Sequence, residues 1–560
     1  MDKSKNYNDR PWLNNYSKEV PSTITYSNII LSEFLQISLK KTPKKTALIY
    51  EGYKVNFEEL NNMVNRFANC LIDFGVEKGD SVAIVLPNSI HFVVSFLAII
   101  KTGAIAVVNN PALTGRELEQ QFNDAKVKIL VTQDIHVNRM IDQRSQMSYL
   151  KQIIYISLDD YLPLFQKIPF INIRKKSVIK KAPDVYKWKE LIIKYKPEPR
   201  EVIINFDDIA MYQYTSGTTG IAKGVTLTHG NISKQLQQLM HWFPDAGDDE
   251  TMLGVIPFFN ISGLTTVLCM SMSSSWTLVI MSEFNTQKII EMIYKYKISI
   301  VSLVPTMYIN LLNHPELNKN KFMSVKTCIS GGDSIPVDII KDFEKKTNSI
   351  ILEGYGLTET SPVTHMNPYN GNRKIGSIGL PIPDTECLIV DWERGDNVVS
   401  INEPGELLVK GPQIMKEYLN KENETMTVLK DGWLYTGDIA TMDEDGYFYL
   451  VDRKHDVIIS NGYYVYPREI EEVFYEYNKI LEVCAIGIRH PSRGEAPIIF
   501  VVLKDGETAN ESDILNFCKG KLAEYKIPIR VEFRKELPKS NSGKVLRRIL
   551  KSSIASRIKP

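Results

Sequence analysis

The sequence predicts an α/β protein with a large N-terminal domain and a small α+β C-terminal domain. Over most of the chain, apolar runs alternate with helical patterns, which is typical of parallel-rich sheets with right-handed crossovers. After residue 400 the pattern changes to short strands separated by Gly and Asp-Gly turns, and a further α+β segment begins near Arg453. We therefore expect two βα subdomains and a small β-barrel-like unit before the C-terminal domain.

The individual elements follow from residue spacing. Residues 57–74 place apolar side chains three and four positions apart, which predicts a helix with one buried face. In the first βα subdomain, strands are expected at 81–86, 104–108 and 129–132, and helices at 89–100 and 115–123. In the second, strands are expected at 277–281, 298–303 and 326–330. In the C-terminal domain we expect a helix at 467–477 and strands at 482–488 and 498–503.

The charges of the 560 residues nearly balance, because 67 Lys and Arg face 66 Asp and Glu. A formal charge of +1 argues against nucleic-acid binding by the whole chain. The balance is uneven, since residues 167–200 carry eleven Lys and Arg but three Asp and Glu. This basic strip starts beside the apolar run YLPLFQKIPFINI. The combination favours peripheral contact with an anionic membrane through residues 161–200, and a solvated loop is the alternative.

Cysteine usage and hydropathy indicate the compartment. Six cysteines are scattered without a CxxC pair, which predicts a reduced, intracellular protein. The uncharged stretch 251–282 is interrupted by Pro257, Asn260, Gly263 and several serines, so it predicts a buried helix followed by a strand. No signal peptide is recognised. We expect a cytoplasmic protein, placed on the inner face of a membrane if the basic strip binds lipid.

The segment YTSGTTGIAKG, residues 214–224, follows an apolar run and predicts a phosphate-binding loop. Its hydroxyls, glycines and lysine can face phosphate oxygens, although its spacing is not that of a Walker loop. The alternative is a surface linker. The candidate nucleotide-binding residues are Thr215, Ser216, Gly217, Thr218, Thr219, Gly220 and Lys223.

A second polar motif is EGYGLTET. Gly354 and Gly356 flank Tyr355 and let the backbone approach a ligand closely. Thr358 and Glu359 offer oxygen ligands, which Mg²⁺ prefers, and a triphosphate needs such a cation to offset its charge. These residue types are compatible with nucleotide and magnesium binding, and the alternative for Glu359 taken alone is a solvated or capping carboxylate.

Two further charged residues extend the candidate nucleotide site. Asp438 in YTGD can accept hydrogen bonds from both hydroxyls of a ribose, and Arg453 in VDRKHD is a fixed cation for ribose or phosphate. An Asp after Gly is more often a turn residue, and a lone Arg is more often part of a surface ion pair. The order of the two and their separation of 15 residues resemble the pattern of a known enzyme family, and this resemblance favours the nucleotide site.

In this order and spacing, the motifs resemble the adenylate-forming (AMP-binding) superfamily, and within it the long-chain fatty acid–CoA ligases. The resemblance runs from RPWL near the N-terminus to KSNSGKVLRR. It implies an adenylation domain at 1–453, a mobile lid domain at 454–560, and a homodimer. It also implies ATP-dependent conversion of a fatty acid through acyl-AMP to acyl-CoA, with Mg²⁺ as cofactor and ATP and coenzyme A as co-substrates.

The resemblance also assigns roles to single residues. It places Tyr355 against the adenine, Thr358 at the α-phosphate and Glu359 on Mg²⁺. Lys544 matches the catalytic lysine of the lid, and His455 occupies the hinge. Rotation about this hinge is expected to remove Lys544 from the site and to bring in the loop at residues 460–462.

The resemblance places the glycine-rich turn ISGGDSIP, which includes Gly332, beside both the adenine of the nucleotide and the acyl pocket. The acyl pocket is also expected to include the segment PFFNISG, with Asn260 and Gly263. Asn260 stands where the family usually has histidine, so the shape of the pocket is in question. Asp333 stands where fatty-acid ligases more often have alanine. A buried carboxylate is unfavourable beside an aliphatic chain, so we expect Asp333 to face the turn backbone or solvent.

Other functions remain open at this point. The substrate could be a medium-chain, aryl or other carboxylate, or the acyl group could pass to a carrier protein instead of coenzyme A. A protein of another class, a non-catalytic sensor of acyl-adenylate or fatty acid, is also compatible with these motifs. The intact lysine, aspartate, glutamate and phosphate loop favour an enzyme.

Overall fold

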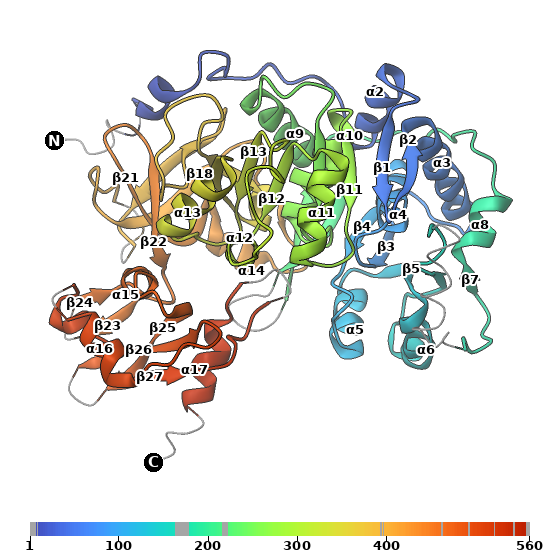
Figure 1. Cartoon of the computed structure of the whole chain (residues 1–560). Helices are drawn as coiled ribbons and strands as arrows, with labels where there is room; N and C mark the ends of the chain where they lie inside the picture. Colours follow the sequence, from blue (N-terminus) through green and yellow to red (C-terminus); the bar gives the residue numbers. More distant parts are fainter. Residues whose placement is uncertain are drawn as a thin grey trace.

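The computed structural model describes residues 7–555, with gaps at residues 8, 163–177, 216–221, 393, 394, 396, 461, 462, 491, 492, 520 and 541–543. It contains two large sheets with parallel cores, a smaller antiparallel sheet and a separate C-terminal unit (Figure 1). The predicted α/β class and the predicted division into layers are therefore confirmed.

One sheet has eight strands in the order β19-β9-β8-β4-β3-β5-β6-β7. The strands from β3 to β8 pair in parallel, whereas β9 and β19 add antiparallel at one edge. The strands are β3 (Ser81–Val85), β4 (Ile105–Val108), β5 (Val127–Gln133), β6 (Gln152–Ile156), β7 (Val185–Lys187), β8 (Ile209–Thr215), β9 (Lys223–Thr228) and β19 (Glu417–Tyr418). Each of the three predicted strands in this region is present.

The other large sheet has nine strands in the order β16-β15-β14-β13-β12-β10-β11-β1-β2. Its six central strands are parallel, and the three outer pairings are antiparallel. The strands are β1 (Thr46–Tyr50), β2 (Tyr53–Asn56), β10 (Thr251–Gly254), β11 (Thr277–Ile280), β12 (Ile300–Leu303), β13 (Thr327–Ser330), β14 (Ile351–Gly356), β15 (Val363–Met366) and β16 (Leu380–Pro381).

Helices cover both faces of both sheets, so the large domain is built in layers. The largest apolar core lies between the sheets and includes residues from α3 (Phe57–Asp73), α4 (Ile90–Lys101) and α9 (His229–Trp242). A second core packs α11 (Thr286–Tyr296), α12 (Pro305–Leu312) and α13 (Val337–Thr347) on the outer face of the nine-stranded sheet. A third packs α5 (Gly115–Asp124) and α6 (Asp134–Gln143) on the eight-stranded sheet.

Local sequence sets where these helices begin. Asn56 accepts a hydrogen bond from the backbone N–H of Glu59, whose carboxylate accepts from the N–H of Asn56, and this capping box starts α3. In α4 Ser89 caps the helix, and every residue of the helix except Lys101 is buried. A helix that is buried on nearly all sides is stable here because it packs against α3 and against β3 and β4 of the eight-stranded sheet.

The uncharged stretch 251–282 differs in detail from the prediction. It begins with strand β10, and its helical part is a π-helical segment, η4 (Ser262–Cys269), that continues into α10 (Met270–Ser273) before β11. The wider π-helical turn is not visible in apolar spacing, because both helix types give an apolar face. In the described part of the chain, no helix has the length and apolar character needed to cross a membrane.

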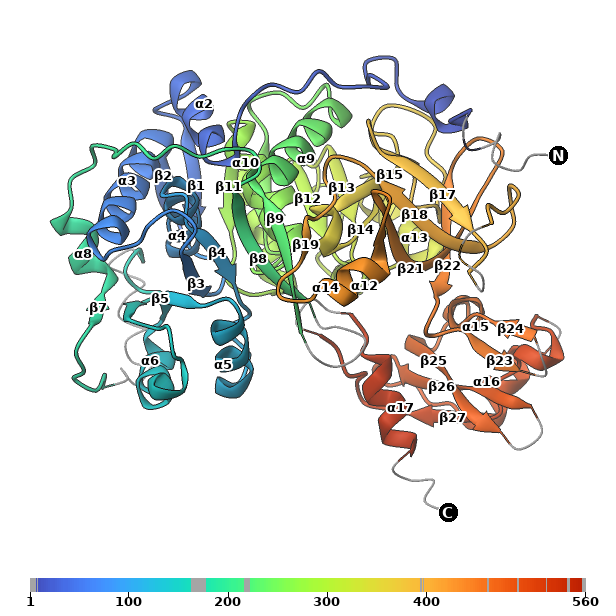
Figure 2. The same cartoon turned by 180° about the vertical axis from the view of Figure 1, so that it is seen from behind.

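The turn-rich region after residue 400 forms most of the smaller sheet, and one strand before it completes the sheet. Its strands are β17 (Glu386–Val390), β18 (Gly405–Lys410), β20 (Leu429–Lys430), β21 (Trp433–Met442) and β22 (Phe448–Arg453), all antiparallel. Strand β22 leads directly into the C-terminal unit, which lies on one side of the large domain (Figure 2).

The C-terminal unit packs helices on a five-stranded sheet of its own. The strands are β23 (Ile458–Ser460), β24 (Tyr463–Val465), β25 (Ile480–His490), β26 (Gly494–Leu503) and β27 (Val531–Phe533), and the helices are α15 (Pro467–Tyr475), α16 (Glu511–Phe517) and α17 (Arg547–Ala555). The predicted helix at 467–477 ends two residues early, and both predicted strands are present but longer.

Candidate active site

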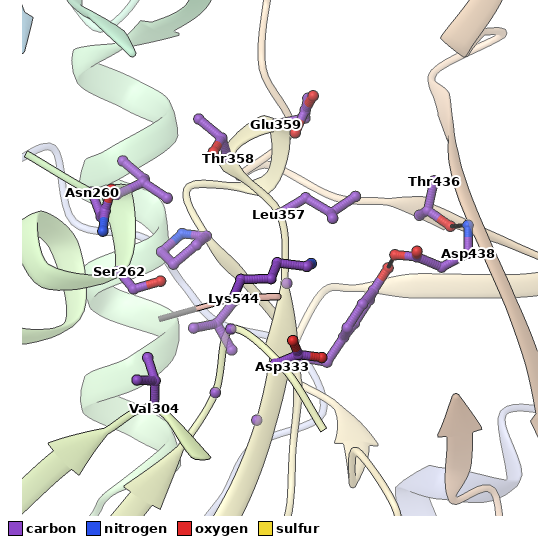
Figure 3. Close-up of a pocket in the computed structure, with 18 of the residues that line it drawn as sticks. Asn260, Ser262, Val304, Asp333, Leu357, Thr358, Glu359, Thr436, Asp438 and Lys544 are labelled. Atoms are coloured by element: carbon purple, nitrogen blue, oxygen red, sulfur yellow. Dashed lines mark hydrogen bonds between the residues drawn. The ribbon is translucent and has the colours of Figure 1, made fainter. Parts of the chain in front are cut away.

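A pocket of about 1150 Å³ lies where the nine-stranded sheet, the small β sheet and the C-terminal unit meet. It opens beyond the carboxyl ends of β13 and β14, which is the usual place for a ligand in an open α/β sheet. Figure 3 shows Lys544 in the middle of the pocket, with Asn260 on one side and Asp438 on the other. Residues far apart in the sequence therefore share one site.

The predicted phosphate loop connects β8 to β9 at the edge of this pocket. Thr215 and Lys223 pair with each other at the ends of the two strands, and both line the pocket. Ser216, Gly217, Thr218, Thr219 and Gly220 lie outside the described residues. The strand ends on both sides of the predicted loop therefore lie at the pocket.

Tyr355, Asp438 and Arg453 form one connected cluster at the opposite wall. The Tyr355 hydroxyl donates to Asp438 Oδ2 at 2.6 Å, and Arg453 Nε lies 3.5 Å from Asp438 Oδ1. Asp438 and Arg453 face each other on the paired strands β21 and β22. Burial, followed by the Asp438 charge, raises the pKa of Tyr355, so its hydroxyl remains a donor.

Glu406 supports this wall from β18, although its sequence pattern gave no indication of such a role. Its carboxylate accepts from the backbone N–H of Gly437 at 3.1 Å and from Lys454 Nζ at 2.9 Å. Gly437 has φ of 71°, a left-handed conformation that favours glycine. Glu406 therefore fixes the bend that orients Asp438.

Thr358 and Glu359 lie in the short 3₁₀ segment η5 (Thr358–Thr360), directly after β14. Both line the pocket. Glu359 Oε1 accepts from the Tyr418 hydroxyl at 2.7 Å, and the backbone N–H of Met415 donates to the Glu359 carbonyl at 2.7 Å. The backbone and side chain of Glu359 are thus both anchored, and no described residue donates a hydrogen bond to its Oε2 atom.

Glycines allow the backbone to approach the pocket closely. Gly332 has φ of 85°, and a Cβ atom at Gly356 would lie 1.7 Å from the Pro362 carbonyl oxygen. Gly354 also lines the pocket between them. Side chains at Gly332 and Gly356 would require the backbone to move, so these two positions demand glycine.

Lys544 enters the pocket from the C-terminal unit, just before α17. Burial lowers the pKa of its ammonium group, and the charge of Arg453 acts in the same direction, while Asp333 and Asp438 oppose them. Asp333 is exposed, and its Oδ1 accepts from the backbone N–H of Ser334 at 2.9 Å. The expectation that Asp333 faces the turn backbone or solvent therefore agrees with the structure.

Asn260 lines the pocket, but Gly263 does not occur among the described residues that line it. Instead, Gly263 packs against the backbone of Pro257, where a Cβ atom would lie 2.2 Å from the carbonyl oxygen. Its place in the acyl pocket therefore stays a prediction, and its contacts indicate a role in backbone packing. Gly263 is needed because the start of η4 crosses the preceding chain at close range.

Beyond Asn260 and Ser262 the pocket continues as an apolar arm. One side of it follows η4 into α10, with Ser262, Thr266 and Met270 at four-residue spacing. The other lining side chains of this arm are largely buried and apolar: Leu239, Phe243, Met252, Trp276 and Ile300. Trp276 Nε1 donates to the Gly247 carbonyl oxygen at 2.8 Å, so the indole presents an apolar ring to the arm.

The junction between the large domain and the C-terminal unit is a turn at residues 453–456. His455 is exposed in this turn, which is closed by a hydrogen bond from the Asp456 N–H to the Arg453 carbonyl at 2.9 Å. On the strand before it, Asp452 accepts from the backbone N–H of Arg468 at 3.0 Å. Burial raises the pKa of Asp452 to about 6.

Comparison with known proteins identifies the class to which this fold and site belong. A family model described as AMP-binding enzyme matches residues 35–419, and one described as AMP-binding enzyme C-terminal domain matches residues 469–544. The chain belongs to the AMP-binding enzyme family.

Within this family, two similar relatives are long-chain-fatty-acid–CoA ligases. That of Bacillus subtilis (strain 168) is 40% identical over 547 residues, which cover 97% of both chains. That of Escherichia coli O157:H7 is 35% identical over 562 residues, covering 98% of this chain and 99% of the relative. The 4-coumarate–CoA ligase 1 of Petroselinum crispum is 31% identical over 555 residues, covering 97% of both chains.

Solved structures are similar over nearly the whole chain. ATP-bound MatB from Rhodopseudomonas palustris has a TM-score of 0.86 at 27% identity, covering 95% of this chain and 100% of that one. The o-succinylbenzoate CoA synthetase MenE from Bacillus subtilis, in complex with the acyl-adenylate intermediate OSB-AMP, has a TM-score of 0.77 at 28% identity, covering 93% and 98%. The fold is thus that of structures solved with ATP and with an acyl-adenylate.

Proposed function

We propose that this protein converts a long-chain fatty acid, ATP and coenzyme A to acyl-CoA, AMP and pyrophosphate. The observation that carries the proposal is the continuity of the pocket: the polar cluster around Lys544 and Asp438 joins the buried apolar arm that runs past Thr266. A carboxylate at the junction could place its tail in the arm and its head beside the nucleotide. The names of two similar relatives, both long-chain-fatty-acid–CoA ligases, support the same substrate class.

The polar end of the pocket suits ATP. We assign the adenine to Tyr355, the ribose hydroxyls to Asp438 and Arg453, and the α-phosphate to Thr358. The loop between Thr215 and Lys223 would hold the remaining phosphates. Hydroxyl and amide donors with one ammonium group are suited to phosphate oxygens.

Mg²⁺ is the cofactor that the family resemblance implies, and Glu359 fits it. Its anchored carboxylate keeps one oxygen for a metal, and Thr358 supplies a hydroxyl oxygen beside it. No group of three or more His, Cys, Asp or Glu that could hold a metal occurs among the described residues. This fits Mg²⁺ that arrives with ATP, since Mg²⁺ commonly uses one or two carboxylates together with phosphates and waters. When bound, it would neutralise phosphate charge.

In the first half-reaction, a carboxylate oxygen attacks the α-phosphorus of ATP, and the bond to the pyrophosphate oxygen breaks. The attack brings two anions together, and Lys544 is placed in the pocket where its ammonium can stabilise the developing charge. Because a free carboxylate is a poor electrophile, the resulting acyl-AMP provides the leaving group that the second half-reaction needs.

In the second half-reaction, the sulfur of coenzyme A attacks the acyl carbonyl carbon, the thiol proton is lost, and AMP leaves. We propose that residues 454–560 form a lid that rotates about His455 between the two steps. The rotation would withdraw Lys544 and bring Ser460 toward the site. Asn461 and Gly462 of the same loop lie outside the described residues.

The proposed substrate is tested by a panel of acids. Purified enzyme should release pyrophosphate with palmitate and ATP, and form palmitoyl-CoA only when coenzyme A is added. Octanoate and an aromatic acid should react more slowly. Preference for the aromatic acid would support an aryl ligase, and failure of coenzyme A to accept the acyl group would point to a carrier protein. Binding of palmitate without pyrophosphate release would indicate a sensor.

The acyl arm makes a specific prediction for Thr266. In Thr266→Trp, the indole should fill the arm, and kcat/KM for palmitate should fall about 100-fold, because excluding four methylenes at about 0.8 kcal/mol each removes about 3 kcal/mol. For butyrate, kcat/KM should fall less than about threefold, because the loss should be smaller than the burial of one methylene, about 0.8 kcal/mol. Thr266→Ser, which adds no volume, is the control. Equal losses for both acids would contradict this placement of the chain.

We further propose peripheral contact with an anionic membrane through residues 161–200, which include the basic strip at residues 167–200. Residues 163–177, including Arg174, Lys175 and Lys176, lie outside the described part. In the remainder, α8 (Trp188–Lys194) exposes Ile193 at 71%, and Val178 is exposed at 88%. Lys189 and Lys194 are exposed on the same helix. Exposed aliphatic side chains beside cations suit a lipid surface.

Reversing two charges on α8 should weaken this contact. The double variant Lys189→Glu/Lys194→Glu should bind vesicles containing phosphatidylglycerol more than about tenfold less tightly, since each cation near such a surface contributes about 1 kcal/mol. Co-sedimentation at low and high salt measures the effect, with phosphatidylcholine vesicles as control. Absent or salt-independent binding of the wild type would leave the solvated surface as the correct interpretation.

The family resemblance also implies a homodimer, which analytical ultracentrifugation tests.

A further inference from the structure

Tyr418 contacts two charged groups at the nucleotide end of the pocket. Its hydroxyl donates to Glu359 Oε1 at 2.7 Å. The ammonium of Lys223 lies 4.9 Å from the centroid of its ring, within the range of a cation–π interaction. All three side chains line the pocket. A single tyrosine therefore holds an anion at its edge and a cation over its face.

The backbone around Tyr418 is fixed to the strand that carries Lys223. The Leu419 N–H donates to the Gly224 carbonyl at 2.7 Å, and the Lys416 N–H donates to the Thr226 carbonyl at 3.0 Å. These bonds make β19 a short antiparallel partner of β9. Because the pairing sets the register, the ring of Tyr418 cannot slide relative to the start of β9.

The same segment also supports the backbone beneath Glu359. The Met415 N–H donates to the Glu359 carbonyl at 2.7 Å, and the Ser361 hydroxyl donates to the Gln413 carbonyl at 2.7 Å. With the backbone held, the Tyr418 hydroxyl selects one orientation of the Glu359 carboxylate. A carboxylate that is already ordered loses less conformational entropy when it binds a cation.

We propose that Tyr418 is a positioning residue that presents Glu359 to Mg²⁺ and Lys223 to the phosphates of ATP. This inference rests on the proposed function, in which Glu359 binds Mg²⁺ that arrives with ATP. The hydroxyl and the ring have separable tasks, because the hydroxyl contacts Glu359 and the ring contacts Lys223. Their positions relative to each other set the spacing between the metal ligand and the phosphate-binding cation.

Two substitutions separate these tasks. Tyr418→Phe keeps the ring and removes the hydroxyl, so half-saturation by Mg²⁺ should shift to about tenfold higher concentration, the effect of losing one hydrogen bond to a charged group. Saturating Mg²⁺ should restore kcat. Tyr418→Leu also removes the ring, so KM for ATP should remain raised about fivefold at saturating Mg²⁺, as expected for a lost cation–π contact.

Binding measurements test the idea without turnover. In isothermal titration calorimetry, Tyr418→Phe should weaken binding of ATP in the presence of Mg²⁺ about tenfold, and leave binding of ATP in excess EDTA unchanged. In the Glu359→Gln background, the same substitution should have no further effect on Mg²⁺ dependence, because the group that it positions has been altered.

Tyr449→Phe is the matched control, since the Tyr449 hydroxyl also donates to a carboxylate, Asp443 Oδ2 at 3.1 Å, outside the pocket. It should leave Mg²⁺ dependence and ATP binding unchanged. A Tyr418→Phe enzyme with a lowered melting temperature but a wild-type Mg²⁺ midpoint would show a purely structural role and overturn the inference. If the wild type itself shows no Mg²⁺-dependent ATP binding, the proposed function fails instead.

Discussion

Lys544→Ala should lower the rate of acyl-AMP formation about 100- to 1000-fold, the range measured when one preorganised donor to developing charge is removed. The reason is geometric. Lys544 is the residue through which the C-terminal unit reaches the centre of the pocket, between the apolar arm and Asp438. Single-turnover release of pyrophosphate from ATP and palmitate measures this step directly.

The thioester step provides the internal comparison. When acyl-AMP is supplied, Lys544→Ala should form acyl-CoA at a rate close to that of the wild type, because the proposed lid rotation would withdraw Lys544 before that step. Lys539→Ala is the control, since Lys539 forms an ion pair with Glu482 away from the pocket. Equal loss of both half-reactions would show that Lys544 supports the fold or the thioester step instead.

The lowered pKa of Lys544 adds a pH signature to this prediction. Because burial favours the neutral amine, the ammonium loses its proton at a lower pH than an ordinary lysine. Adenylation should therefore decline as pH rises through the lowered pKa, while the thioester step should not share this decline. Lys544→Arg, whose guanidinium stays charged, should be slower but should lack the alkaline limb.

Asp438→Asn should lower kcat/KM for ATP about 100-fold, because two hydrogen bonds to a charged acceptor, at about 1.5 kcal/mol each, would be lost or weakened. Asp438 already accepts from Tyr355 at 2.6 Å and lies 3.5 Å from Arg453. An amide presents one acceptor oxygen where the carboxylate presents two. The substitution should thus disturb the tyrosine and the ribose together.

Asp443→Asn is a matched control for this change. Asp443 accepts from Tyr449 at 3.1 Å and pairs with Lys374 at 2.6 Å. The substitution therefore disrupts a similar cluster of a carboxylate, a tyrosine and a cation, but outside the pocket. Initial rates over a range of ATP concentrations, together with melting temperatures, distinguish the two variants. Unaltered ATP saturation in Asp438→Asn would remove Asp438 from the nucleotide site.

Much of the fold could be predicted because its signals are local. Helix α3 and strands β3 to β5 follow from the spacing of apolar residues within one segment. The π-helical turn of η4 could not be predicted in this way, because its apolar face resembles that of an ordinary helix.

The candidate site was predicted where a motif keeps its chemistry within a few residues, as in the segment that includes Tyr355 and Glu359. Tyr418 and Glu406 were missed for the opposite reason. Tyr418 lies in a two-residue strand and acts on a glutamate 59 positions away. Neither residue has neighbours of its own that indicate a site. Gly263 shows a further limit, since a glycine next to a pocket motif packs against the backbone of Pro257.

The sequence by itself determined the layered α/β class, the membership of the motifs in an adenylate-forming enzyme and the candidate nucleotide residues. It could do so because periodicity and short motifs are properties of neighbouring residues. Only the tertiary structure decided that Lys544 and Asp438 line the same pocket and that Tyr418 contacts both Lys223 and Glu359. It alone also showed that an apolar arm of the pocket continues along η4. These depend on how strands and helices distant in the chain pack together, which residue spacing alone does not specify.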